Sequence, residues 1–180
     1  MENGRRLIEA YEINSSTLAV SPVSYGNKLF SKIYELDEEF ISPFKPIEII
    51  KESCFSFGST YEGRKEATRK LIGITHKVPI AISPLIYFFP TSSPEVPHCV
   101  WVAQEHILDY KKGSESSTTI VRFKNDQLIS LPISSSSFEN QLIRTMMLRT
   151  KLTRKKMVYS NNIRRELSAE ESGDYFWENL

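Results

Sequence analysis

The sequence has few of the features that would form a membrane span, a leader or a disulfide scaffold. No apolar run approaches the roughly 18 residues that cross a bilayer. Arg5 and Arg6 are not followed by the apolar stretch of a secretory signal. Cysteine occurs only at Cys54 and Cys99, and a chain of 180 residues can bury a core without disulfides. We therefore expect reduced thiols, a cytoplasmic location and no membrane partner.

Acidic residues are absent from Asn140 to Arg165, a segment that contains eight lysines or arginines. Because the whole chain has a formal charge of only +1, this positive charge is concentrated in one place. Acidic residues gather between Glu35 and Glu39 and again after Arg165. Such segregation indicates a polyanionic partner such as nucleic acid. The alternative is a surface helix whose charge is balanced inside the molecule by those acidic segments.

The order of apolar patterns and turn residues predicts an α+β fold with a mostly antiparallel β core. Two helices are expected near 46–72, beginning at Pro46 and Tyr61, and one long basic C-terminal helix near 137–157. The expected turns are Tyr25-Gly26-Asn27 and Asn125-Asp126. The expected strands are 7–20, 29–41, 78–82, 85–89, 100–110, 118–123 and 127–131. We expect a single α+β domain over residues 1–160 and an acidic C-terminal tail over 161–180.

The long helix has a recognisable start and an apolar face. Ser136 and Glu139 have the spacing of a capping box, which predicts that the helix opens at Ser136. Helical periodicity places Phe138, Leu142 and Met146 on the apolar face. Arg149 falls on the same side, so we expect it to pair or to extend past the helix end.

A second group of cations lies within seven residues, at Arg64, Lys65, Arg69 and Lys70. Neighbouring hydroxyls and backbone amides near the glycines of 58–63 could bond phosphate oxygens. The alternative is a solvated helix start whose charge is partly neutralised by nearby glutamates.

Metal binding and catalysis have weak support. Structural zinc normally draws on closely spaced pairs of ligands, and the two cysteines and three histidines do not form them. The segment 58–65 lacks the terminal Gly-Lys-Ser/Thr order of a phosphate loop. We expect no enzymatic activity, no cofactor and no metal. The aromatic run 87–89 is assigned to the core, as are Phe55 and Phe57, whose alternation suits one face of a buried strand.

Several segments together resemble the family of bacterial competence transcription factors, ComK. They are Ser-Cys-Phe-Ser-Phe-Gly-Ser-Thr-Tyr-Glu-Gly-Arg-Lys (53–65), Thr-His-Lys-Val-Pro-Ile (75–80), Phe-Phe-Pro-Thr-Ser (88–92) and His-Cys-Val-Trp-Val (98–102). The most specific is Leu-Pro-Ile-Ser-Ser-Ser-Ser-Phe-Glu-Asn-Gln-Leu-Ile-Arg-Thr-Met-Met-Leu-Arg-Thr-Lys (131–151). The resemblance extends from about residue 10 to 167, in the same order and with similar spacing.

The resemblance implies a cytoplasmic, non-catalytic activator that switches on DNA-uptake and recombination genes and its own gene. The family binds paired A/T-rich boxes of double-stranded DNA as a dimer or higher oligomer, largely from the minor groove, and an adaptor delivers it to a Clp-type protease. Narrow A/T grooves favour arginine, which makes Arg64, Arg69, Arg144 and Arg149 the first candidates. On charge alone, the predicted DNA-binding residues are Arg64, Lys65, Arg69, Lys70, Lys77, Arg144, Arg149, Lys151, Arg154, Lys155 and Lys156.

The sequence departs from the family pattern near its C-terminal end. Well-known members carry an additional basic and hydrophobic segment there, with an aromatic-Met-Leu-Tyr-Pro-Lys element tied to adaptor recognition. Here Thr150-Lys-Leu-Thr-Arg-Lys-Lys continues almost directly into Met157. The shortening is compatible with DNA binding and argues against adaptor-driven degradation. A non-activating paralogue, or an interaction module whose basic helix docks an acidic protein, stays open as an alternative.

Overall fold

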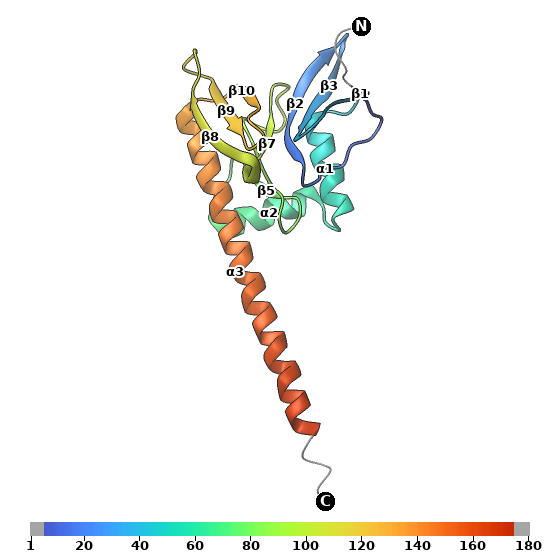
Figure 1. The fold of residues 1–180 in the computed structure, drawn as a ribbon, viewed down its shortest axis with the longest axis vertical. Helices are drawn as coiled ribbons and strands as arrows, with labels where there is room; N and C mark the ends of the chain where they lie inside the picture. The colour runs from blue at the N-terminus through green and yellow to red at the C-terminus, as the bar shows by residue number, and fades with distance from the viewer. Residues whose placement is uncertain (1–5, 175–180) are drawn as a thin grey trace, which may run out of the picture.

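The computed structural model describes residues 6–174, with side chains described to residue 168. This part of the chain forms an α+β fold, which confirms the predicted class (Figure 1). In chain order the elements are β1 (Arg6–Leu7), β2 (Thr17–Tyr25), β3 (Lys28–Glu35), β4 (Glu39–Ser42), α1 (Pro46–Ser56), α2 (Tyr61–Ile72), β5 (Ile80–Ala81), β6 (Tyr87–Pro90), β7 (Trp101–Ala103), the short 3-10 helix η1 (Gln104–His106), β8 (Ile107–Lys112), β9 (Thr119–Phe123), β10 (Leu128–Leu131) and α3 (Ser135–Asp174).

The strands form a larger and a smaller sheet. The larger has the order β1-β4-β3-β2-β7-β6-β5, and the smaller β10-β9-β8. Neighbouring strands are antiparallel, apart from the parallel pair β1–β4. Gly26, at φ +59°, forms the predicted turn between β2 and β3, and Asp126, at φ +64°, lies in the predicted turn between β9 and β10.

Three of the predicted strands are interrupted. The segment 29–41 forms two antiparallel strands, β3 and β4, joined by a turn in which the Glu35 N–H donates to the Glu38 carbonyl at 2.9 Å. The segment 7–20 is not continuous, because Asn14 forms a turn before β2: its side-chain oxygen accepts from the Ser16 N–H at 2.8 Å and its carbonyl from the Thr17 N–H at 3.2 Å. The predicted strand 100–110 is interrupted by η1. There the chain leaves the larger sheet after β7 and enters the smaller sheet at β8.

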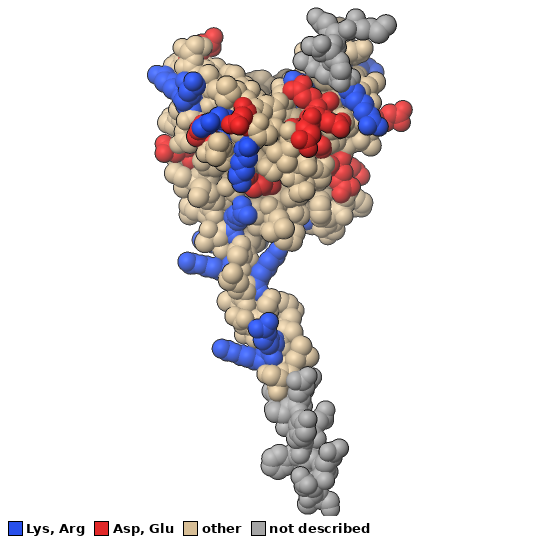
Figure 2. Space-filling view, viewed as in Figure 1, with Lys and Arg blue, Asp and Glu red and all other residues tan. Residues whose placement is uncertain are grey.

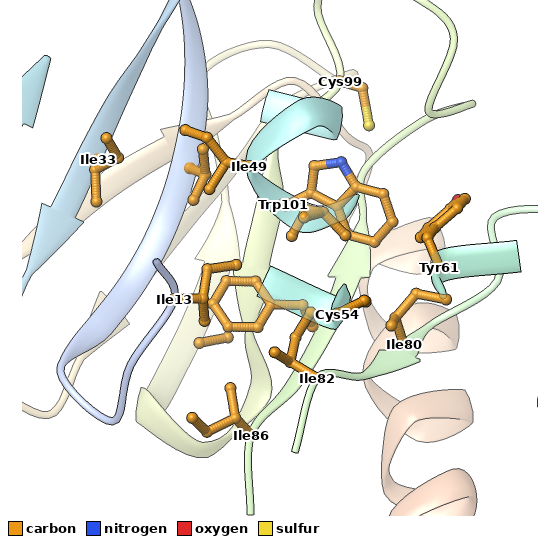
Figure 3. Close-up of a cluster of buried hydrophobic side chains, with 14 residues drawn as sticks. Ile13, Ile33, Ile49, Cys54, Tyr61, Ile80, Ile82, Ile86, Cys99 and Trp101 are labelled. Carbon is orange, nitrogen blue, oxygen red and sulfur yellow. The ribbon is translucent and has the colours of Figure 1, made fainter. Parts of the chain in front are cut away.

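The strands β6 and β7 are buried on both faces. Successive side chains of a strand point to opposite sides, and every side chain of these two strands is buried. Phe88 and Trp101 contribute to the core beneath α1, shown in Figure 3. Phe89 and Val102 contribute to a second core, against the smaller sheet and the start of α3. Burial on both faces explains the continuous apolar run 87–89, which is core as predicted.

The helices α1 and α2 lie where the sequence predicts them. Pro46 opens α1, as expected, and α2 has its predicted bounds. The expectation for Phe55 and Phe57 was wrong: their side chains are 69% and 41% exposed. This segment is the end of a helix, and the helix presents Ser53 and Cys54 to the core instead.

The long helix α3 begins slightly earlier than predicted, and the Ser136–Glu139 capping box is wrong. Ser134 occupies the capping position: its hydroxyl accepts from the Ser137 N–H at 3.4 Å and its carbonyl from the Phe138 N–H at 2.9 Å. Several serines in this run could cap the helix. We infer that the burial of Phe138 fixes the start of the helix so that Ser134 is the one that does.

The buried face of α3 is also rotated from the predicted one. Phe138 is fully buried as expected, but Met146 is 51% exposed. Gln141, Thr145 and Leu148 are buried in its place. Polar Gln141 and Thr145 can lie in the core because both find hydrogen-bond partners there.

Beyond the body α3 continues as a single helix to Asp174 (Figure 1). The division into a domain over 1–160 and an acidic tail over 161–180 stays a prediction. The end of that tail, 175–180, lies outside the described residues.

Gln141 attaches α3 to the rest of the protein. Its buried side-chain amide donates to the carbonyls of Lys77 and Pro90, each at 2.8 Å. We expect Gln141→Leu to lower the free energy of unfolding by about 2–4 kcal/mol, because two inward-facing carbonyls lose their donor. Urea unfolding measures the change. Asn140→Leu, on the exposed neighbour, is the matched control, and an equal effect of the two substitutions would contradict the assignment.

Candidate nucleic-acid interface

The first basic segment is held on α2 by defined helix ends. The Thr60 side chain accepts from the Gly63 N–H at 3.1 Å and so caps the start of the helix. Gly73, at φ +69°, ends it in the left-handed conformation that glycine adopts most easily. Segment 58–65 is therefore mainly a helix start, and its cations lie along α2.

The C-terminal end of α2 packs against the middle of α3, so the fold brings together the two basic segments that the sequence separates. Leu71 and Ile72 of α2 pack with Leu148 and Leu152 of α3. At the edge of this contact the Lys151 ammonium donates to the Leu71 carbonyl at 2.6 Å. This bond satisfies one of the carbonyls that a helix end leaves unpaired.

The two candidate arginines of α2 turn toward the protein. Arg64 donates to the carbonyls of Ala81 and Phe57, and the second distance is 3.1 Å. Arg69 donates to the Thr75 carbonyl at 3.0 Å and lies 3.8 Å from the Glu66 carboxylate. Both guanidinium groups therefore fasten loops to α2.

The two candidate arginines of α3 are also engaged within the protein. Arg144 donates to the Gln141 side-chain oxygen at 3.3 Å. Arg149 donates to the side-chain oxygen of Gln104 in η1 at 3.2 Å, and its guanidinium carbon lies 5.6 Å from the centre of the Tyr87 ring. The expectation that Arg149 would pair is confirmed.

Lys65 and Lys77 are half-buried. The Lys65 ammonium lies 3.7 Å from the Glu62 carboxylate and 5.7 Å from the centre of the Tyr61 ring. Lys77 has a left-handed backbone, with φ +48°, and its carbonyl is one of the two acceptors of Gln141. Both lysines are thus partly committed to the fold.

The other cations of α3 point into solvent. Arg154, Lys155, Lys156, Arg164 and Arg165 are exposed, and none forms an ion pair or side-chain hydrogen bond with another described residue. Figure 2 shows basic side chains projecting along the helix below the body. At the adjoining end of α2 the Lys70 side chain is 77% exposed, although its ammonium lies 3.7 Å from Glu66. We call Lys70, Lys151, Arg154, Lys155, Lys156, Arg164 and Arg165 the basic helix surface.

The acidic cluster between Glu35 and Glu39 does not neutralise this surface. Two of its carboxylates have other partners: Glu35 accepts from Tyr11 and Asn14, and Glu39 pairs with Lys32 at 2.9 Å. Figure 2 shows acidic side chains gathered on the upper body, away from the projecting helix. The sequence offered two acidic segments that could balance this surface, and of these the acidic residues from Glu166 to Asp174 are part of α3 itself.

Glu105 of η1 is a partly buried carboxylate close to Arg149, which bonds to the neighbouring Gln104. One of its oxygens accepts from the Tyr87 N–H at 3.2 Å, and the other is buried without a hydrogen-bond partner. Burial, opposed by the neighbouring Arg149, raises the pKa of Glu105 above its ordinary value. An ionised Glu105 therefore opposes folding at neutral pH, and the penalty disappears as the pH falls through its raised pKa.

Replacing Glu105 by glutamine should consequently raise the melting temperature at pH 7, by about 2–4 °C if the penalty is about 1 kcal/mol. At pH 4 the gain should vanish, because both side chains are then neutral. Calorimetry at the two pH values measures the difference, with the exposed Glu95→Gln as control. A gain of equal size at both pH values would contradict the assignment.

The cysteines and histidines do not converge. Cys54 and Cys99 are buried and free, and burial raises the pKa of both thiols, that of Cys54 to about 11. The His106 ring contacts the Ser15 carbonyl at 2.8 Å. Among the residues that the structure describes, no three His, Cys, Asp or Glu side chains gather in a way that could hold a metal ion. None of the described helices has the length and apolar character needed to span a membrane.

The fold and this surface define an α+β protein with a long, exposed basic helix. Residues 8–157 match the family described as "ComK protein". The chain is also 44% identical over 146 residues to the "Competence transcription factor" of Bacillus subtilis (strain 168), an alignment that covers 80% of this chain and 76% of that relative. The chain therefore belongs to the ComK family, and membership supports a transcriptional regulator of competence. No solved structure matches the chain.

Proposed function

We propose that this protein is a DNA-binding transcriptional activator of competence genes, those of DNA uptake and recombination, and that it acts in the cytoplasm. It binds paired A/T-rich boxes as an oligomer and reads them largely from the minor groove. The proposal involves no catalysis and no cofactor. It rests on family membership and on one structural observation: the cations of the basic helix surface beyond Lys151 have no partner among the described side chains.

The dimensions of the basic helix surface suit a duplex. Lys151 and Arg165 are 14 residues apart, which corresponds to about 21 Å of helix at 1.5 Å per residue. That length equals about six base pairs, so several phosphates lie within its reach. We assign phosphate contacts to Lys70, Lys155 and Lys156. Among the arginines, Arg154 is free to enter a narrow groove, whereas Arg64, Arg69, Arg144 and Arg149 mainly hold the surface in place.

The test measures the affinity of the full chain for a duplex that carries two A/T boxes, by fluorescence anisotropy. We expect binding that weakens by about 10³-fold or more between 50 and 200 mM salt, as six or more phosphate contacts require. A duplex of the same length with G·C boxes should bind more weakly. No binding to either duplex at 50 mM salt would overturn the proposal, and binding of an acidic protein instead would support the interaction module.

Inosine–cytosine pairs separate the two grooves. An I·C pair presents the minor-groove acceptors of an A·T pair but lacks its major-groove pattern. A duplex with I·C boxes should therefore bind nearly as well as the A/T duplex. If I·C boxes bind as poorly as G·C boxes, readout is from the major groove.

The family resemblance also implies a further partner, an adaptor that delivers the protein to a Clp-type protease. The match to the family ends at residue 157, while α3 continues to Asp174. Because the C-terminal element tied to adaptor recognition in well-known members has no counterpart in this sequence, we expect adaptor-driven turnover of this chain to be weak or absent.

A further inference from the structure

A cavity of about 410 Å³ lies between the segment that precedes β2 and the first turns of α1. Its volume falls within the range of about 300–1,000 Å³ that is typical of small-molecule sites. In Figure 1 α1 lies on the right of the body, whereas α3 begins on the left, so the cavity is separate from the basic helix surface. The residues that line it are Ala10, Tyr11, Phe44, Glu48, Ile49 and Glu52.

Two aromatic rings line this cavity, and the fold holds both of them in place. The Tyr11 hydroxyl donates to the Glu35 carboxylate, and the centre of its ring lies 6.1 Å from that of Phe40. Phe44 is 47% exposed, and its carbonyl accepts from the Ser31 hydroxyl at 2.7 Å. Aromatic rings attract ammonium groups that lie over their faces. These walls therefore suit a ligand that is both apolar and cationic.

Two carboxylates of α1 complete the lining. Glu48 and Glu52 are four residues apart on one side of the helix, which separates them by about 6 Å along its axis. Neither forms an ion pair with another described residue. The two lysines nearest to them in the sequence are directed elsewhere: the Lys51 ammonium lies 5.8 Å from the centre of the Tyr61 ring, and Lys45 lines a different cavity. The negative charge of the site is therefore available to a ligand.

We propose that this cavity binds an aliphatic polyamine, with one ammonium group at each carboxylate of α1 and the methylene chain against the two rings. Ammonium groups joined by three or four methylenes are about 5–6 Å apart, since each bond of the chain is about 1.5 Å long, and this matches the separation of Glu48 and Glu52. Glu9 and Glu12 are exposed on the segment that carries Tyr11, and they add to the attraction for a cation.

Isothermal titration calorimetry of the full chain with spermidine tests the site, at about 20 mM salt to limit screening. Exposed ion pairs and cation–π contacts are individually weak, so we expect a dissociation constant of about 0.1–1 mM. Butylamine has a single ammonium group and should bind about 5-fold more weakly, because it forms one ion pair fewer. Equal binding of the two amines, or no binding of spermidine, would overturn the proposal.

Removing the two carboxylate charges locates the binding. Glu48→Gln/Glu52→Gln should weaken spermidine binding by about 10-fold. Glutamine at position 48 keeps a side-chain acceptor for the Lys45 N–H, which Glu48 bonds at 2.7 Å, so the start of α1 is preserved. Asp37→Asn/Glu38→Gln is the matched control, because it removes the same charge from the exposed turn between β3 and β4. An equal loss in the two variants would show that spermidine responds to net charge alone and would overturn the proposal.

Phe44→Leu tests the aromatic wall, because leucine stays apolar but lacks the ring. We expect spermidine binding to weaken by about 3-fold. Phe55→Leu is the control: Phe55 is 69% exposed near the other end of α1, and its replacement should leave the affinity unchanged. The same effect in both variants would remove the ring from the site and overturn the proposed arrangement.

Tetralysine distinguishes a free polyamine from a protein that presents the same ammonium groups. Spermidine should bind this site more tightly than tetralysine, whose backbone does not fit a cavity of this volume. Tighter binding of tetralysine, lost in Glu48→Gln/Glu52→Gln, would identify a lysine-rich protein segment as the occupant and overturn the choice of a polyamine. These titrations contain no DNA, so their outcome is separate from that of the DNA-binding test.

Discussion

Replacing Arg154, Lys155 and Lys156 together by glutamine should lower the affinity for an A/T-box duplex by about 10²–10³-fold at 50 mM salt. These three cations are exposed and make no ion pair with another described residue, so their removal costs the fold little. Each cation set against a phosphate displaces condensed counterions and adds about 0.9 to the slope of log affinity against log salt. Lys155 and Lys156 are assigned to phosphates and Arg154 to the groove, so the slope should fall by about 1.8 per protein chain, and by about 2.7 if Arg154 also neutralises a phosphate.

The matched control is Lys28→Gln/Lys111→Gln/Lys112→Gln, which removes the same charge from exposed strand ends of β3 and β8. Anisotropy over a range of salt concentrations gives both the affinity and the slope. An equal loss in the two variants would show that net charge, not this surface, governs binding. An unchanged slope in the first variant would place the DNA-binding surface elsewhere on the protein.

Phe138→Ala should produce the largest loss of stability, about 3–5 kcal/mol. The ring is fully buried in the first turn of α3. Its centre lies 5.5 Å from that of Phe89 in the larger sheet and 4.9 Å from that of Tyr110 in the smaller sheet. The substitution would leave a cavity at the point where both sheets and α3 meet.

Urea unfolding measures this change, with Ile143→Ala as control, since Ile143 lies on the same helix and is 49% exposed. The control should lose less than about 1 kcal/mol. A loss at Phe138 no larger than that at Ile143 would show that α3 is anchored elsewhere, with Gln141 as the next candidate.

Local sequence patterns predicted the helices well where residues such as proline and glycine mark the start or end of an element. Pro46 marked the start of α1, and α2 has its predicted bounds. Prediction failed where a tertiary partner decides between local options. Several serines could cap α3, and the packing of Phe138 selected Ser134. The strand predicted over 100–110 is interrupted at η1 because the chain passes there from the larger sheet to the smaller one. The apolar pattern of residues 100–110 gives no sign of this change of sheet.

The direction in which each arginine side chain points could not be predicted from the sequence, for a related reason. A guanidinium has five N–H donors and can satisfy backbone carbonyls as readily as phosphates. Arg64 and Arg69 bond to carbonyls of Ala81 and Thr75, which lie beyond the end of α2 in the sequence. In the linear sequence these arginines are indistinguishable from the outward-facing Arg154.

The sequence by itself determined the α+β class, the concentration of positive charge in one segment and the resemblance to the ComK family. These follow from composition, spacing and the order of motifs, which are properties of the chain alone. The tertiary structure decided which cations face solvent, that α2 adjoins α3, and that Tyr11 and Phe44 line one cavity with α1. Each of these depends on contacts between residues far apart in the sequence, such as Lys151 with Leu71, and such contacts exist only in the folded chain.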